Sequence, residues 1–288
     1  MRDIIKKDCK SEGKSKEKIR KIKIILAVLT TLSLFSLTGM VVLATLGCIE
    51  KPQHQEELIL SNYPKLFEKD VIIVVGENTT QIENDATKAI AYNLGEFTGN
   101  TPVIKTDAEV TEIEKAGYNL ILLGRSDTNK MLRDIYERTN ATRVTDEYPG
   151  AGKGVLEVLG NPWNESKVML LVQGSDEWGV RAGSVILEEK QKVKDKAKVV
   201  VDWEEATGVK FPIDSAEEAI RYANMDVKVK RFVKTWSTTG NKVKAEAKFS
   251  NSSNNWDIMY RADTPILENW YMIVINSNGT IIDKRGFL

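Results

Sequence analysis

Residues 154–172 read GVLEVLGNPWNESKVMLLV, and this stretch decides the class of sheet in the folded part of the chain. Two apolar runs, Gly154–Leu159 and Lys167–Val172, lie on either side of the connection Gly160–Ser166. That connection is too short for the crossover helix that a parallel pair of strands requires. The two runs are therefore predicted to form an antiparallel hairpin.

The sequence before this hairpin alternates between strands and helices. Val71–Val75 and Asn119–Leu123 are continuous apolar runs, each followed by glycine, as expected of strands buried between layers of helices. The predicted elements are, in order, a strand at 71–75, a helix at 81–98, a strand at 102–105, a helix at 109–116, a strand at 119–123 and a helix at 128–139. This alternation predicts βαβ units and a parallel sheet.

After the hairpin, a helix is predicted at 176–192 and an edge strand at 198–202. Residues 69–210 are therefore expected to form an α/β domain. Its sheet should be mixed but mainly parallel, because the hairpin joins a βαβ pattern, and helices should cover both faces.

Residues 211–288 have the pattern of a second, smaller α+β domain. Ser215–Ala223 opens with a helix cap and with acidic residues in the first turn. Strands are predicted after it at 227–236, 242–250, 256–261, 270–276 and 280–284. The last two are joined through Ser277–Gly279, whose Asn-Gly pair favours a hairpin turn.

The N-terminal part of the chain predicts a membrane anchor. Ile24–Cys48 contains no charged residue, and as a helix it is long enough to cross a bilayer core of about 30 Å. Residues 1–23 hold ten Lys and Arg, which predicts a cytoplasmic tail and places the C-terminal domains outside. Residues 49–68 contain two prolines and read as a stalk.

The two cysteines lie on opposite sides of this predicted span. Cys9 is in the tail and Cys48 is at the outer end, so the exported part has no internal disulfide. Thr45–Cys48 ends in the Gly-Cys of a lipoprotein processing site, which makes lipidation of Cys48 an alternative to an uncleaved anchor. The apolar run is, however, longer than that of a removable signal.

Charge and histidine content exclude several classes of function. The tail carries a net charge of +6, so the remainder of this formally neutral chain is −6, which argues against a nucleic-acid partner. The single histidine, His54, lies in the predicted stalk, where we expect its side chain to be solvated and not to bind a metal. Catalysis by a Ser-His-Asp triad or by a histidine-bound zinc is thereby removed. We predict no cofactor and no metal.

The strands that end in glycine define a candidate ligand-binding rim, since ligands of open α/β sheets bind beyond the carboxyl ends of the strands. Ordinary turn and capping roles are the competing interpretation, because acidic residues already supply negative charge to the helix ends. The rim comprises Gly76, Gly124, Arg125, Ser126, Gly174 and Ser175.

Two stretches carry a resemblance to a known family. Gly152–Asn164 (GKGVLEVLGNPWN) and Leu171–Gly183 (LVQGSDEWGVRAG) resemble a domain of archaeal S-layer and related surface proteins, over residues 69–192 or so. Gln173 and Val180 depart from that pattern, where a small residue and threonine are usual. The resemblance implies a structural role in the envelope, and it supplies no catalytic residues.

The C-terminal part is similar to PepSY-like and cystatin-like modules in its helix, its antiparallel sheet and the run WYMIVINSNGTII at 270–282. This similarity implies a binding or inhibitory module, for example one that acts on a peptidase. Its aromatic residues either form a binding face or fill the small core. They are Trp236, Trp256, Tyr260, Trp270 and Tyr271.

Five Asn-x-Ser/Thr sequons lie on the predicted outer side of the membrane, mostly in predicted loops where glycans fit. The candidate glycosylation sites are Asn78, Asn140, Asn164, Asn251 and Asn278.

Three functions are compatible with these features. The leading hypothesis is a non-enzymatic envelope protein, anchored in the cell membrane and associated with other envelope or surface-layer proteins. The second is an anchored module that binds and regulates a secreted or membrane protein. The third is an enzyme in which Asp127, Asp176 or Glu177 acts as acid or base at the rim. The sequence leaves the oligomeric state open.

Overall fold

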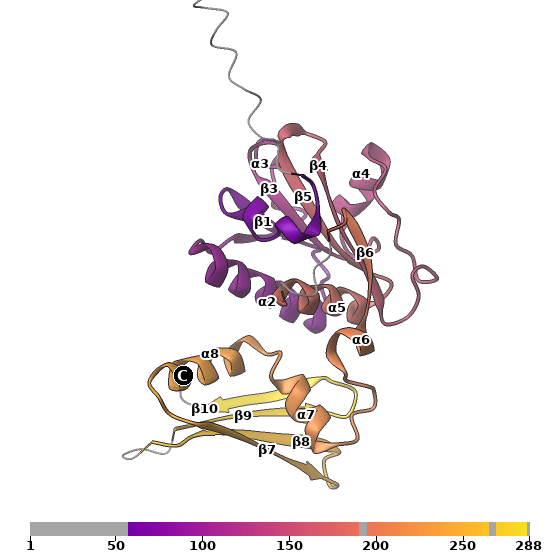
Figure 1. The fold of residues 1–288 in the computed structure, drawn as a ribbon. Helices are drawn as coiled ribbons and strands as arrows, with labels where there is room; N and C mark the ends of the chain where they lie inside the picture. Colours follow the sequence, from indigo (N-terminus) through magenta and orange to yellow (C-terminus); the bar gives the residue numbers. More distant parts are fainter. Residues whose placement is uncertain (1–56, 190–194, 265–268, 287–288) are drawn as a thin grey trace, which may run out of the picture. The chain divides into compact units, whose positions relative to one another are not determined.

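The computed structural model describes residues 57–189, 195–264 and 269–286 (Figure 1). Within these residues, the first sheet contains six strands. Their order across the sheet is β2-β1-β3-β5-β4-β6. The strands are β1 (Val71–Val75), β2 (Val103–Thr106), β3 (Asn119–Gly124), β4 (Lys153–Asn161), β5 (Asn164–Gly174) and β6 (Lys198–Asp202).

The sheet is mixed, as the short connection at 160–166 predicts. β2, β1, β3 and β5 are parallel, whereas β4 pairs antiparallel with both β5 and β6. In the β4–β5 hairpin, Val158 lies opposite Leu170 and Gly154 lies opposite Gly174. The prediction of an antiparallel hairpin inside a mainly parallel sheet is confirmed.

Helices cover both faces of this sheet. α2 (Gln81–Thr98) and α5 (Glu177–Glu188) pack on one face, and α4 (Lys130–Arg138) packs on the other. The short helix α3 (Glu112–Gly117) buries none of its residues. Successive residues of a strand pack into different cores. Ile73 belongs to the core with α2 and α5, whereas Ile72 belongs to the core with α4. This division explains why the central strands are apolar on both faces.

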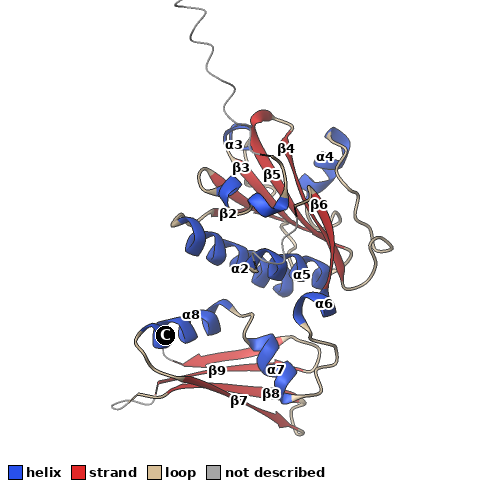
Figure 2. Cartoon of the chain, viewed as in Figure 1, coloured by secondary structure: helices blue, strands red, loops and turns tan. Residues whose placement is uncertain are grey.

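A second, antiparallel sheet follows in the C-terminal part. It is reached through α6 (Trp203–Thr207), α7 (Ala216–Ala223) and α8 (Val227–Thr238). Its order is β10-β9-β8-β7, formed by β7 (Val243–Ser250), β8 (Asn255–Ala262), β9 (Asn269–Asn276) and β10 (Ile281–Gly286). Figure 2 shows the strands of the two sheets in red, with blue helices between them.

One prediction for this part is wrong, because residues 227–236 form helix α8 and not a strand. Their β-branched residues favour a strand, but the buried Val229 and Phe232 lie three positions apart, as on one face of a helix. Asp226 caps the helix by accepting hydrogen bonds from the backbone N–H groups of Lys228 and Val229. The smaller α+β part therefore has two helices before its sheet.

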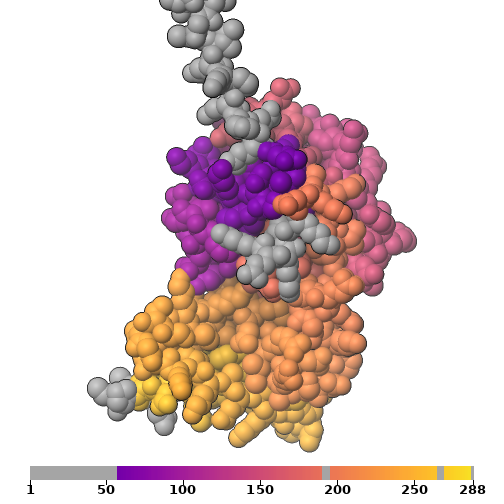
Figure 3. Space-filling model, in the orientation of Figure 1, coloured from indigo at the N-terminus to yellow at the C-terminus, as the bar shows by residue number. Residues whose placement is uncertain are grey.

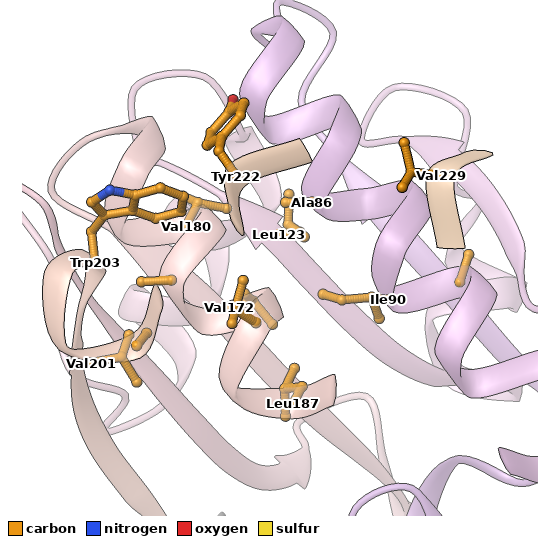
Figure 4. Packing of buried hydrophobic residues seen from close by; sticks show 14 of the residues in the cluster. Ala86, Ile90, Leu123, Val172, Val180, Leu187, Val201, Trp203, Tyr222 and Val229 are labelled. Atoms are coloured by element: carbon orange, nitrogen blue, oxygen red, sulfur yellow. The ribbon is translucent and has the colours of Figure 1, made fainter. Parts of the chain in front are cut away.

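The larger of the two described cores, the one that contains Ile73, connects the α/β part to the C-terminal part. It contains side chains from β1, β3 and β5, from helices α2, α5, α7 and α8, and from β8 and β9. Figure 4 shows members of this cluster from both parts, such as Leu123, Val180, Tyr222 and Val229. The rings of Trp178, Trp203, Phe211 and Tyr222 lie within 6.2 Å of one another and join α5 and α6 to α7.

The described end of the predicted stalk is folded. Residues 57–68 form two short 3₁₀ helices, Leu60–Asn62 and Lys65–Phe67, and Leu60, Tyr63 and Phe67 are buried in the main core. Large apolar side chains at these positions explain the packing, because their burial stabilises the fold.

The predicted tail, the predicted span Ile24–Cys48 and His54 lie outside the described residues. Among the residues that are described, no helix has the length and apolar character needed to cross a membrane.

Candidate functional site

The glycines of the predicted rim lie at one edge of the sheet, at the carboxyl ends of β1, β3 and β5, and the chain's own backbone packs against two of them. A Cβ atom at Gly76 would lie 2.1 Å from the carbonyl oxygen of Thr128. A Cβ at Gly174 would lie 2.3 Å from the carbonyl oxygen of Asp176. Gly124 has φ +127°, a conformation that side chains disfavour. Close packing and backbone geometry thus account for all three glycines.

The polar residues of the rim are also engaged within the protein. Ser175 is buried and its hydroxyl accepts a hydrogen bond from the N–H of Gly150 at 3.1 Å. The carbonyl of Ser126 accepts one from Arg133 at 2.8 Å. The guanidinium of Arg125 lies 3.4 Å from the carboxylate of Asp127.

Glu83 is the most unusual ionisable group at this edge, and sequence reasoning did not single it out. Its side chain has no exposed surface. One carboxylate oxygen accepts a hydrogen bond from the N–H of Thr80, and the other lies 3.6 Å from Nε of Arg125. Burial raises the pKa of Glu83, while the Thr80 N–H and the Arg125 charge lower it to a smaller extent.

The three carboxylates considered for an enzymatic role have separate surroundings. Asp176 caps α5 by accepting from the N–H of Gly179 at 2.8 Å, and its second oxygen accepts from the N–H of Gly152 at 2.7 Å. Glu177 lies in the first turn of α5, and Asp127 pairs with Arg125. The described residues contain no cluster of three or more His, Cys, Asp or Glu side chains able to hold a metal ion.

The candidate aromatic face is divided between the core and the surface. Trp256, Tyr260 and Tyr271 are buried, and the indole N–H of Trp256 donates to the carbonyl of Ile213 at 3.1 Å. Trp236 is half-buried beside Phe232 on α8. Trp270 lies opposite Arg261 in the strand register, on the other face of the sheet from Tyr271. These five residues therefore do not gather on one face.

Four of the five candidate glycosylation sites are exposed: Asn78, Asn140, Asn251 and Asn278. Asn164 differs, because its side-chain amide donates to the carbonyl of Ala116 at 2.8 Å and its oxygen accepts from Ser166. The nitrogen that a glycan would modify is therefore already hydrogen-bonded at Asn164.

A cavity of about 850 Å³ lies between α2 and α8. Figure 3 shows the purple atoms of the α2 region meeting the orange atoms of the C-terminal part, where helix α8 lies. We call this cavity the α2–α8 groove. Its lining residues are Asp85, Lys88, Ala91, Tyr92, Gly95, Glu96, Thr101, Ile104, Met225, Asp226, Val227, Lys228, Arg231, Lys234, Thr235 and Lys284.

Ion pairs fix the walls of the α2–α8 groove. Lys234 of α8 contacts Glu96 of α2, and Lys284 of β10 lies 2.5 Å from Asp226. The guanidinium of Arg231 lies over the ring of Tyr92, 5.3 Å from its centroid. Residues from α2, α8 and β10 thus form one basic surface.

Sequence reasoning missed this groove because it assigned residues 227–236 to a strand. On a strand, Lys228 and Arg231 point to opposite faces, whereas on a helix residues three apart share a face. The helical spacing of Lys228, Arg231 and Lys234 was the signal that could have found it.

The fold is thus a mixed α/β sheet joined to a helix-covered antiparallel sheet, and no family model matches the chain. An uncharacterized protein of Methanocaldococcus jannaschii is 23% identical over 156 residues, which are 52% of this chain and 35% of that protein. The chain thus spans about a third of the length of this curated relative. The solved structure of CpGH84D is 14% identical, with 46% of this chain and 20% of that chain covered. The TM-score of this comparison is 0.29.

Proposed function

We propose that this protein is anchored in the cell membrane by one helix and serves a structural, non-enzymatic role in the envelope, in association with surface-layer proteins. The observation that carries the proposal is the uncharged run Ile24–Cys48 behind a tail of ten basic residues. Such a run partitions into the bilayer, and the basic tail is retained on the cytoplasmic side.

The packing at the sheet rim supports a role without catalysis. Backbone packs against Gly76 and Gly174, and the nearby Glu83 has no exposed surface. A catalytic carboxylate has to reach its substrate within hydrogen-bonding distance. The resemblance of Gly152–Asn164 and Leu171–Gly183 to archaeal surface proteins also supports an envelope setting.

A second candidate function is an anchored module that binds and regulates a secreted or membrane protein. The α2–α8 groove favours it, because a concave basic surface with an aromatic side chain suits recognition of another molecule. Binding through this groove is compatible with a structural role.

The topology can be tested with cysteine labelling in intact cells. The chain has two cysteines, so a Cys9→Ser/Cys48→Ser/Asp146→Cys variant carries one thiol at an exposed position of the α/β part. We expect a membrane-impermeant maleimide to label this variant in intact cells, because the proposal places residue 146 outside.

The matched control retains only Cys9, through Cys48→Ser. Its thiol is expected to react only after lysis. Labelling of Cys9 in intact cells, or of residue 146 only after lysis, would contradict the proposed orientation. Intact-mass measurement of the extracted native protein completes the test, since a chain beginning at Cys48 would replace the uncleaved anchor by a lipid anchor.

A further inference from the structure

We propose that the α2–α8 groove binds an acidic, extended segment of a partner protein, whose backbone pairs with the edge of strand β2. This inference rests on the proposed function in one respect, which is the compartment where the protein meets its partner. The binding itself follows from three features of the described residues: charge in the groove, apolar exposure on β2, and the direction of the β2 backbone groups.

The first feature is an excess of cations in the groove. Its lining contains five cationic side chains and three acidic ones. Glu96 and Asp226 are each paired with a lysine of the groove, and Asp85 lies 4.0 Å from Lys88. Lys228 and Arg231 are exposed on α8, and Arg231 contacts the Tyr92 ring and not a carboxylate. Carboxylates of a partner would therefore find two cations, Lys228 and Arg231, that have no carboxylate partner among the described residues.

The second feature is the apolar exposure of β2. β2 is an edge strand, and among the described strands it pairs only with β1. Val103 and Ile104 are 51% and 44% exposed, on opposite faces of the strand. Exposed apolar side chains on an edge strand favour association with another strand, and soluble proteins commonly protect such edges. A partner that covers Val103 and Ile104 would explain why these apolar side chains are exposed.

The third feature is the direction of the β2 backbone. The N–H of Asp107, just after β2, donates to the carbonyl of Val75 on β1, whereas the N–H of Thr106 donates to the side chain of Glu109. N–H groups alternate in direction along a strand, so the N–H of Ile104 points away from β1 in the same sense as that of Thr106. Ile104 therefore offers its backbone to an added strand.

These features meet at Ile104, which belongs to β2 and also lines the groove. A strand added beside β2 would alternate its side chains between two faces. One set would enter the groove toward Lys228 and Arg231, where acidic residues are favoured. The other set would lie beside Val103, where apolar residues are favoured. The partner segment is therefore expected to alternate acidic and apolar residues.

The positions of the sequons are compatible with this use of the groove. None of the five candidate sites is among the residues that line it. Glycans at these positions would not be attached within the proposed contact surface.

The test uses the full-length protein in detergent and a short synthetic peptide of alternating glutamate and valine, with fluorescence anisotropy as the readout. We expect saturable binding that weakens as salt is raised, because exposed ion pairs are screened. A peptide of the same composition with its glutamates and valines in two blocks, and an alternating lysine–valine peptide, are expected not to bind.

Two pairs of variants separate charge from strand pairing. Lys228→Gln/Arg231→Gln should weaken binding about fivefold, as expected for the loss of two exposed ion pairs. Its matched control, Lys244→Gln/Lys248→Gln, removes two exposed lysines of β7 and should leave binding unchanged. Ile104→Pro removes the outward N–H and should weaken binding about tenfold, whereas Ile104→Thr retains that N–H and should weaken it less.

Equal binding of the blocked and alternating peptides would overturn strand pairing. Equal losses in the groove and β7 double variants would overturn the site. Both outcomes leave the membrane topology untouched, so failure of this inference is distinguishable from failure of the proposed function.

Discussion

At the scale of single residues, the glutamates of two capping boxes of the same composition have pKa values shifted in opposite directions. Thr80 with Glu83 opens α2, and Thr111 with Glu114 opens α3. Burial raises the pKa of Glu83, whereas the hydrogen bonds from Lys105 and from the backbone of Thr111 lower the pKa of Glu114 to about 2. The capping box fixes the hydrogen bonds of its glutamate, whereas the burial of that glutamate determines how unfavourable its ionised form is.

We predict that Glu83→Gln raises thermal stability relative to the native protein at neutral pH. A raised folded pKa stabilises the fold below the unfolded pKa, near 4.5, and this contribution is lost as pH rises through the folded pKa. The difference in melting temperature, variant minus native, should therefore increase from pH 4.5 upward. Melting of the detergent-solubilised protein across pH measures it.

Glu114→Gln is the matched control with the opposite sign. A lowered folded pKa stabilises above the unfolded value and loses that contribution as pH falls through about 2. This variant should be less stable than the native protein above pH 4.5 and should approach it in strong acid. The same pH trend in both variants would contradict the burial argument.

At the scale of elements, the contact of α5 with the β4–β5 hairpin depends on glycine. A Cβ at Gly179 would lie 1.9 Å from the carbonyl oxygen of Lys153, and a Cβ at Gly154 would lie 2.5 Å from the carbonyl oxygen of Gly179. Helix and strand backbones therefore touch. Both glycines lie in the stretches from which the resemblance to surface-layer proteins is predicted, and in this structure they serve close packing.

We predict that Gly179→Ala destabilises the protein by about 3 kcal/mol, because the helix has to move away from β4. Chemical denaturation of the detergent-solubilised protein measures the free energy of unfolding. The matched control is Gly95→Ala in α2, where the nearest atom to a new Cβ is 3.6 Å away. Alanine there should stabilise by about 0.5–1 kcal/mol through helix propensity. Equal effects at both positions would contradict the packing argument.

At the scale of the molecule, Arg181 connects the α/β part to the C-terminal part. It is 5% exposed on α5, and it donates to the carbonyl of Met225 at 2.7 Å and to that of Asp85 at 3.4 Å. A buried guanidinium requires such partners, since an unsatisfied charge in the core is costly. The turn between α7 and α8 is thereby fixed against α5 and α2.

We predict that Arg181→Met destabilises the protein by about 3 kcal/mol, because the half-buried carbonyl of Met225 loses its donor. Hydrogen exchange should increase most in α7 and α8, which distinguishes a loss of docking from general destabilisation. Arg221→Met is the control: Arg221 also donates to a backbone carbonyl, that of Gly208, but is exposed. Its loss should cost under about 1 kcal/mol. A uniform rise in exchange across the sheet would contradict the docking role.

The local pattern of the chain predicted most of the elements. The apolar runs at Val71–Val75 and Asn119–Gly124 became the central parallel strands, and the short link after Leu159 required the antiparallel hairpin. The α7 cap at Ser215 and the strands after residue 242 were also found. These features depend on neighbours in sequence, so a single sequence contains their signal.

What the sequence by itself determined is the alternation of strands and helices, the hairpin inside the sheet and the uncharged run Ile24–Cys48. The tertiary structure decided the helical state of residues 227–238, the burial of Glu83 and the α2–α8 groove. The physical reason is the separation in sequence between the residues that interact. Periodicity reports the face of one element, whereas burial and grooves arise only when α2, α8 and β2, distant in sequence, pack together.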